Sequence, residues 1–134
     1  MAEYYAPKNF NLWYYFGGLA LLVEDSDDLR ATFRDMLMDL DYSVIEATSV
    51  DEATALAADL PDISLILSDI HLTGSATGLD LHDRLSGSGL PIILMTSTPA
   101  SDPLHATALR KCPVLHKPFT AADLATLIRA KDAA

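Results

Sequence analysis

The sequence predicts an α/β fold in which a doubly wound, five-stranded parallel sheet carries helices on both faces. Three observations support this prediction. Short apolar runs of strand length alternate five times with segments of helical periodicity. Two of the runs, 19–23 and 63–68, are apolar at positions facing both sides, which is typical of strands buried within a parallel sheet. Turn-forming and helix-capping residues separate the runs, and strands that alternate with helices in this way form parallel sheets.

The first two strands are expected at 19–23 and 42–47, each followed by a helix. Ser26 or Asp27 can cap a helix that runs to about residue 40, because a side-chain oxygen at that position accepts a hydrogen bond from the first turn. Ser49 similarly caps an alanine-rich helix that extends to about residue 60. The first helix should bury an apolar stripe made of Leu29, Phe33, Met36, Leu37 and Leu40.

The second half of the chain repeats the same alternation three times. Strands are expected at 63–68, 91–96 and 114–116. Helices are expected at about 79–85, at about 102–111 and from 120 onward. Asp102 followed by Pro103 is typical of a cap and first helical position, and Thr120 can cap the last helix.

Right-handed crossovers restrict five such units to a doubly wound sheet. The flavodoxin-like strand order 2-1-3-4-5 places the carboxyl ends of the first and third strands side by side, where open α/β sheets bind their ligands. We therefore expect one domain over residues 19–131, an aromatic-rich arm or leader over 1–18, and a short tail over 132–134.

Residues 1–18 hold seven of the ten aromatic residues of the chain. Because exposed aromatic surface is unfavourable in water, one interpretation is an arm that covers its own domain, a second copy or a partner. The alternative is a leader or part of an upstream linker. A signal peptide is not predicted, since a basic start and an aliphatic core are both missing.

The composition argues against nucleic acid as a partner, a membrane span and an internal disulfide. The formal net charge of −10, with nine Lys and Arg in all, argues against nucleic acid. No apolar stretch approaches the roughly 20 residues of a membrane span. Cys112 is the single cysteine, so no internal disulfide forms, and a cytoplasmic location is expected. We interpret Cys112 as a small hydrophobic residue, and the four histidines as surface or packing residues.

Acidic residues follow the first and third strands. Glu24 and Asp25 come after 19–23, and Asp69 comes after 63–68, so three carboxylates should meet in one crevice. Carboxylates this close repel unless they take up protons or a cation joins them. Hard oxygen ligands in a small site favour Mg²⁺, which keeps free positions for other oxygens.

Two further polar residues fall at the same edge of the sheet. Thr96 ends the fourth strand and Lys117 ends the fifth. A lysine ammonium and a hydroxyl can both bind phosphoryl oxygens, and phosphoryl transfer depends chiefly on such electrostatic positioning. Asp69 is the natural nucleophile, because carboxylates can form aspartyl-phosphates. As alternatives, the first two acids could simply begin a helix, and Ser97 or Thr98 could replace Thr96.

Four segments in register now point to a family: LALLVEDS, LILSDIHL, PIILMTS and LHKPF. Together with the alternating units, they resemble the receiver domain of two-component response regulators over about residues 19–131. The resemblance implies that Asp69 is the phosphoacceptor, and that Thr96 and Lys117 contact the phosphoryl oxygens. It implies that Mg²⁺ is held by Asp25, Asp69 and the backbone carbonyl of His71, with Glu24 acting mostly through water. It also makes the bond between Lys117 and Pro118 a candidate for the cis form.

The expected function is stoichiometric acceptance of a phosphoryl group from a histidine kinase or a histidine phosphotransfer protein. Signalling is then expected to pass to a downstream protein target, since no DNA-binding output domain is expected. Candidate surfaces for a homodimer are the N-terminal arm and the face formed by the fourth helix, the last strand and the last helix. The alternatives are a pseudo-receiver that dimerises constitutively and a Mg²⁺-dependent aspartyl-phosphate phosphatase.

The chain also departs from the family pattern. Val114 stands three residues before Lys117, where the family usually has Tyr or Phe, so the usual coupling between threonine and an aromatic ring is in doubt. Thr73 stands where proline is frequent, and one extra residue precedes Gly78. Such a loop is often found in receivers attached to hybrid kinases.

Overall fold

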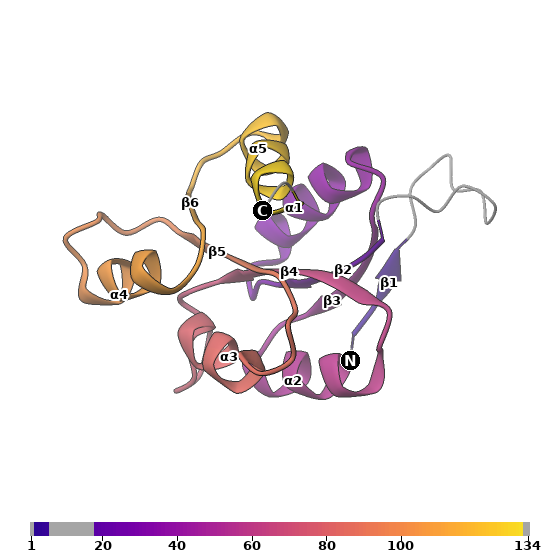
Figure 1. Ribbon diagram of the computed structural model, residues 1–134, viewed down its shortest axis with the longest axis horizontal. Helices are drawn as coiled ribbons and strands as arrows, with labels where there is room; N and C mark the ends of the chain where they lie inside the picture. The colour runs from indigo at the N-terminus through magenta and orange to yellow at the C-terminus, as the bar shows by residue number, and fades with distance from the viewer. Residues whose placement is uncertain (1, 6–17, 133–134) are drawn as a thin grey trace.

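The computed structural model describes residues 2–5 and 18–132 of the chain (Figure 1). Six strands form one sheet in the order β1-β3-β2-β4-β5-β6. The strands are β1 (Tyr4–Tyr5), β2 (Leu19–Val23), β3 (Ser43–Ala47), β4 (Ile63–Asp69), β5 (Ile92–Thr96) and β6 (Val114–His116). The helices are α1 (Asp27–Asp39), α2 (Val50–Asp59), α3 (Gly78–Leu85), α4 (Pro103–Lys111) and α5 (Ala121–Asp132).

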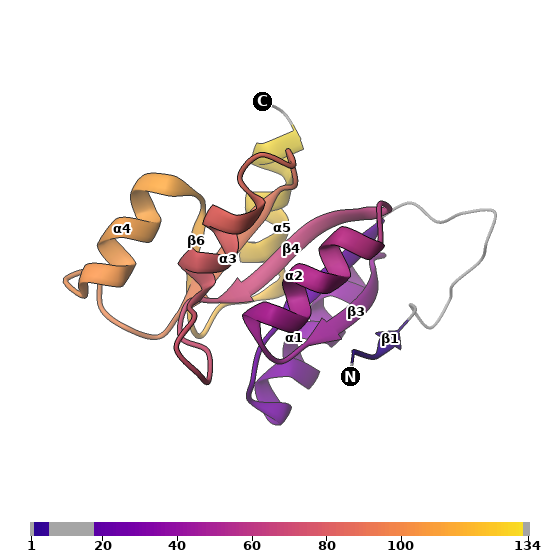
Figure 2. The ribbon, with the colours of Figure 1, turned by 90° about the horizontal axis from the view of Figure 1, so that it is seen from below.

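Helices cover both faces of the sheet. Figure 1 shows α1 and α5 on one side of the strands and α2 and α3 on the other, and Figure 2 shows the same layers from below. Alternate residues of β2 enter different cores, as the strand period of two requires. Leu21 packs with residues of the α2 side, whereas Leu22 packs with Phe33 of α1 and Leu124 of α5. Both faces of the central strands are therefore buried.

The predicted five parallel strands and their order are confirmed, because β2, β3, β4, β5 and β6 pair in parallel in that arrangement. The predicted caps are also observed. The hydroxyls of Ser26 and Ser49 accept from the first turns of α1 and α2, and Asp102 caps α4. The Thr120 hydroxyl accepts from the N–H of Asp123 at 3.1 Å. Local hydrogen bonding thus starts each of these helices where the sequence predicts.

The stripe predicted on α1 is wrong at one residue. Phe33 and Leu37 are buried beneath the helix, but Leu29 is 40% exposed. Leu29 lies in the first turn, close to the capping hydroxyl of Ser26, which accepts a hydrogen bond from its N–H at 3.3 Å.

The antiparallel edge strand β1 was not predicted. Tyr4 and Tyr5 pair with Ile45 and Val44 of β3, so the beginning of the chain packs on its own domain. The Tyr5 ring also lies under the guanidinium of Arg34, whose central carbon is 4.3 Å from the ring centroid. A two-residue strand has no detectable periodicity, so only the tertiary contacts reveal it. The rest of the aromatic segment, residues 6–17, lies outside the described residues.

None of the described helices has both the length and the apolar composition required to span a membrane.

Candidate functional site

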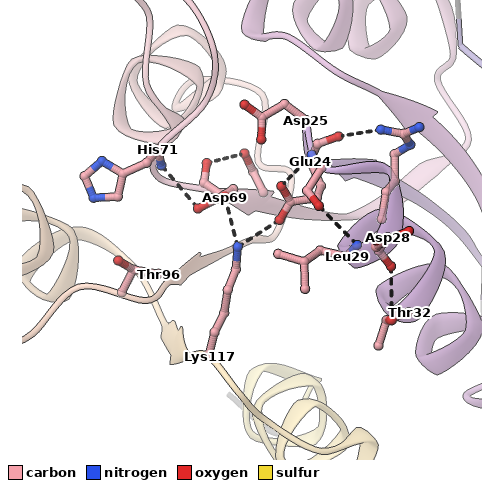
Figure 3. Close-up of polar contacts among 12 residues, drawn as sticks. Glu24, Asp25, Asp28, Leu29, Thr32, Asp69, His71, Thr96 and Lys117 are labelled. Carbon is pink, nitrogen blue, oxygen red and sulfur yellow. Dashed lines mark hydrogen bonds and ion pairs between the residues drawn. The ribbon is translucent and has the colours of Figure 1, made fainter.

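Three carboxylates meet at the carboxyl ends of β2 and β4, as predicted. The two strands pair in parallel, with Val23 beside Ser68, so the residues that follow each of these meet at one edge of the sheet. Glu24, Asp25 and Asp69 each offer an oxygen, and these oxygens lie within 4.8 Å of one another. Glu24 and Asp69 are buried, whereas Asp25 is partly exposed at the rim. Figure 3 shows the group from close by.

The ammonium of Lys117 joins two of these acids. Its Nζ lies 2.8 Å from Oε1 of Glu24 and 3.0 Å from Oδ2 of Asp69 (Figure 3). Burial raises the pKa of the Glu24 carboxyl above its ordinary value, although the hydrogen bond from Lys117 opposes the rise. Burial alone would lower the pKa of Lys117, but its bonds to Glu24 and Asp69 outweigh this effect and raise it. The site therefore holds a charged lysine among excess negative charge.

Glu24 is held by its local backbone. The N–H of Ser26 donates to Oε2 of Glu24 at 3.1 Å, and Arg30 Nη1 donates to the Glu24 carbonyl at 3.1 Å. A second bond from Arg30, to Asp27 at 2.6 Å, keeps the guanidinium beside the first turn of α1. The side chain of Glu24 is thus fixed toward Lys117, with which it makes a direct ion pair.

Asp69 is fixed from the loop that follows it. The N–H of His71 donates to Oδ1 of Asp69 at 3.2 Å (Figure 3), and the N–H of Gly78 donates to the Ile70 carbonyl at 2.8 Å. Gly78 begins α3 against this strand end, and a Cβ there would lie 2.3 Å from the Asp69 carbonyl oxygen. Only a glycine lets the helix approach so closely.

Asp25 is bound from the same loop. The N–H of Thr73 donates to Oδ2 of Asp25 at 2.8 Å, and the Thr73 hydroxyl donates to the same oxygen. The hydroxyl bond is the main reason that the pKa of Asp25 is lowered below its ordinary value. The carboxylate at the rim is therefore ionised and oriented.

Thr96 lies at the end of β5, beside β4, and its side chain is buried. Its hydroxyl is 2.8 Å from the hydroxyl of Thr98, and the N–H of Thr98 donates to it at 3.1 Å. The N–H of Lys117 donates to the Thr96 carbonyl at 2.7 Å, which holds the ends of β5 and β6 together. The sequence offers Thr98 as an alternative to Thr96, and in the structure the two hydroxyls are hydrogen-bonded to each other.

The region near Val114 contains a histidine pair. His105 of α4 is buried, and its Nδ1 lies 2.9 Å from the Thr98 carbonyl. Its ring stacks on His116 at the end of β6, with centroids 6.1 Å apart. His105 therefore packs within the fold, as expected for a packing residue, and it contacts the same loop that binds Thr96. The peptide bond between Lys117 and Pro118 is cis.

The residues present fit a small divalent cation. Three carboxylates face one ammonium, so the cluster keeps an excess of negative charge when its acids are ionised. All three donors are hard oxygen ligands, which Mg²⁺ prefers. Asp25 and Asp69 would hold it, with Glu24 close by and the backbone of His71 next to Asp69.

Three residues of the site were missed as contributors. Arg30, Thr73 and Gly78 contact backbone or carboxylate atoms of the cluster. The sequence shows that this loop departs from the family pattern, but nothing in the spacing indicates that Thr73 reaches a carboxylate 48 positions earlier. Gly78 was detectable in principle, since glycine at a helix start often marks close backbone approach.

The chain matches the family model of the response regulator receiver domain over residues 20–129. Among solved structures, it is 34% identical to the signal receiver domain of a modulated diguanylate cyclase from Desulfovibrio desulfuricans, with a TM-score of 0.74 and coverage of 84% of this chain and 91% of that one. It is 26% identical to chemotaxis protein CheY4 from Vibrio cholerae, with a TM-score of 0.69 and coverage of 84% and 96%.

A third similar structure is the signal receiver domain of a putative Luxo repressor protein from Vibrio parahaemolyticus. It shares 26% identity with this chain and has a TM-score of 0.71, with coverage of 87% of this chain and 94% of that one. Among curated protein sequences, none matches the chain significantly. The family model covers most of the chain, and the architecture and the acidic strand ends agree with it. This chain therefore belongs to the response regulator receiver domain family.

Proposed function

We propose that this receiver accepts a phosphoryl group on Asp69 from the phosphohistidine of a histidine kinase or a histidine phosphotransfer protein. The observation that carries the proposal is the convergence of Asp69, Asp25, Glu24 and Lys117 within hydrogen-bonding or metal-ligand distance at one sheet edge. A buried carboxylate beside a lysine is suited to attack on phosphorus, because the ammonium offsets the repulsion between the acid and an anionic donor.

In the proposed reaction, a carboxylate oxygen of Asp69 forms a bond to phosphorus as the phosphorus–nitrogen bond of the donor histidine breaks. The electron pair of that bond leaves with the imidazole, which takes up a proton. Bound Mg²⁺ supplies positive charge to the phosphoryl oxygens when present. Lys117 is already within 3.0 Å of Asp69, so it can follow the new oxygens with little movement. His71 holds the other oxygen of Asp69 through its N–H.

Phosphorylation would act as a switch by changing the partners of Lys117 and Thr96. In the described state, Lys117 is shared by two carboxylates, and the Thr96 hydroxyl is bonded to Thr98. A phosphoryl group on Asp69 offers both residues a stronger acceptor. The resulting preference for one conformation would be read by a downstream protein, since ligands act by shifting populations between existing states.

The experiment that tests the function is intact-protein mass spectrometry with acetyl phosphate and Mg²⁺. We expect the wild type to gain one phosphoryl group and Asp69→Asn to gain none. Asp25→Ala should lose both the labelling and the binding of Mg²⁺, because it removes a carboxylate from the rim of the site. Asp62→Asn is the matched control, since Asp62 is exposed and precedes β4 at the end opposite Asp69.

Labelling of Asp69→Asn at the wild-type level would place the modification elsewhere, and an unlabelled wild type at saturating donor would favour a constitutive interaction module. Continuous turnover of a small phosphoester that stops in Asp69→Asn would indicate a phosphatase instead. A single stoichiometric mass gain, without turnover of an external substrate, is the result that this proposal requires.

A further inference from the structure

We propose that Thr73 is a positioning residue that holds Asp25 ready for the divalent cation. This inference rests on the proposed function, because it assigns a second layer of contacts to the same site. It concerns the loop between β4 and α3, in which the sequence departs from the pattern of the family it resembles.

The geometry that carries the inference is a double hydrogen bond between distant parts of the chain. The N–H of Thr73 donates to Oδ2 of Asp25 at 2.8 Å, and the hydroxyl of Thr73 donates to the same oxygen. Asp25 follows β2 and Thr73 follows β4, so the two bonds connect the ends of neighbouring strands across the mouth of the site. A proline at residue 73 could make neither bond, because it has no N–H and no hydroxyl.

The loop that carries Thr73 is itself anchored on both sides. Ile70 and Leu72, which precede Thr73, are buried in the core. After it, the capping box of Thr77 and the bond from the Gly78 N–H to the Ile70 carbonyl, at 2.8 Å, fix the start of α3. The backbone on both sides of Thr73 is thus held by packing and hydrogen bonds, although Thr73 itself is exposed.

Such bracing matters because Asp25 is the least buried of the three acids, and water would otherwise let its side chain change rotamer. Glu24 and Asp69 are held by Lys117, whereas the bonds from Thr73 hold Asp25. Hydrogen bonds to a ligating carboxylate fix its orientation, and removing one typically costs about 10–100-fold in metal affinity. Thr73 therefore orients the Asp25 carboxylate, which lies at the rim of the site, for metal binding.

A graded series at residue 73 tests the inference. Thr73→Ser keeps both donors, Thr73→Val keeps only the N–H in a side chain of the same shape, and Thr73→Pro keeps neither. We expect the Mg²⁺ dissociation constant, measured by titration calorimetry without a phosphodonor, to stay near the wild-type value for serine. It should rise about tenfold for valine and further for proline.

Labelling kinetics supply a second readout. With acetyl phosphate, the Mg²⁺ concentration that gives half-maximal labelling should rise in Thr73→Val, while the rate at saturating Mg²⁺ stays close to that of the wild type. Thr126→Val is the matched control, because the Thr126 hydroxyl bonds within α5, to the Ala122 carbonyl at 2.9 Å. Thermal unfolding of each variant shows whether it is folded. If Thr73→Ser keeps the wild-type Mg²⁺ dependence, the change in Thr73→Val comes from the lost hydrogen bond and not from a lost structure.

The inference would be overturned if the valine and proline variants bound Mg²⁺ with affinities within about twofold of the wild type. Tighter binding by these variants would also overturn it, because it would mean that Thr73 competes with the ion. Failure of the proposed function gives a different result, in which the wild type itself neither binds Mg²⁺ nor becomes labelled. A labelled wild type with an unaffected Thr73→Val would reject only the role of Thr73.

Discussion

At the scale of single residues, the site is a buried charge cluster whose acids respond differently to their surroundings. Burial raises the pKa of Glu24, while the Thr73 hydroxyl lowers that of Asp25. Lys117 bridges Glu24 and Asp69 and keeps the cluster from carrying three uncompensated negative charges. Charges that are out of water need such pairing, because desolvation otherwise favours their neutral forms.

The raised pKa of Glu24 predicts a pH dependence of folding stability in the absence of Mg²⁺. In the unfolded chain, Glu24 titrates near its ordinary value of 4.5, whereas in the folded protein it holds its proton to higher pH. Its contribution to stability is therefore fully present below about 4.5 and is lost as the pH rises through the folded pKa. We expect Glu24→Gln to flatten this decline in urea unfolding measured at a series of pH values.

Asp25→Asn is the matched comparison, because the pH dependence of stability expected from Asp25 has the opposite sign. Because the pKa of Asp25 is lowered in the folded state, its contribution to stability is present above its ordinary value of 3.8 and is lost as the pH falls through the folded pKa. We therefore expect Asp25→Asn to change the pH dependence of the free energy of unfolding at acid pH. Identical pH profiles for the wild type and both variants would contradict the assigned environments.

At the scale of elements, the start of α3 determines where the strand end that bears Asp69 lies. A Cβ at Gly78 would lie 2.3 Å from the Asp69 carbonyl oxygen and 3.0 Å from the Ile70 Cα. Gly78→Ala should therefore move the helix or the strand end, lower the free energy of unfolding by about 1–3 kcal/mol and slow labelling of Asp69. Urea unfolding and the labelling assay measure the two effects.

Gly87→Ala is the control for that prediction. Apart from Gly87 itself and its chain neighbours, no heavy atom of the described residues lies within 4 Å of the position that a Cβ would take there, so we expect no clash. Its free energy of unfolding should stay near that of the wild type or rise slightly, because alanine restricts the unfolded chain. Equal stabilities and equal labelling rates for the two alanine variants would show that the close approach at Gly78 is unimportant.

The loop between β5 and α4 shows how another element contacts the site. The Thr96 hydroxyl is bonded to Thr98, and the Thr98 carbonyl is bonded to His105, which stacks on His116. The contacts that lead from Thr96 toward α4 therefore pass through a histidine, while residue 114 is a valine. The sequence shows that residue 114 lacks the aromatic ring usual in the family. The stacking of His105 on His116, by contrast, depends on how α4 packs against β6.

At the scale of the whole molecule, β1 closes one edge of the sheet. Two backbone pairs join it to β3, and the Tyr5 ring packs on Arg34, which also makes an ion pair with the buried Glu46 at 3.4 Å. Exposed sheet edges pair readily with other chains. The position of β1 therefore favours the interpretation of the first residues as an arm that covers its own domain.

Deletion of residues 1–17 tests this role. The deletion exposes the edge of β3, so we expect increased self-association in sedimentation velocity experiments, while labelling of Asp69 continues because β1 lies beyond β3 from the acidic site. Labelling of the truncated chain by acetyl phosphate serves as the internal control. An unaltered sedimentation profile would show that the segment does not protect the edge.

The α/β class, the order of the five parallel strands and the helix caps could all be predicted from the sequence. The same holds for the strand ends that carry Glu24, Asp25, Asp69, Thr96 and Lys117. The strand ends and helix caps follow from local patterns of apolar and capping residues, whereas the strand order follows from the right-handed crossovers of a doubly wound sheet.

Which side chains bond across the site depends on the packing of the elements and could not be predicted from the sequence. The bond from Thr73 to Asp25, the approach of Gly78 to Asp69 and the pairing of β1 with β3 join segments that lie apart in the sequence. Leu29 fits the apolar period of α1 but is 40% exposed. Periodicity describes the faces of an element, whereas contacts of this kind depend on the distances between elements after they pack.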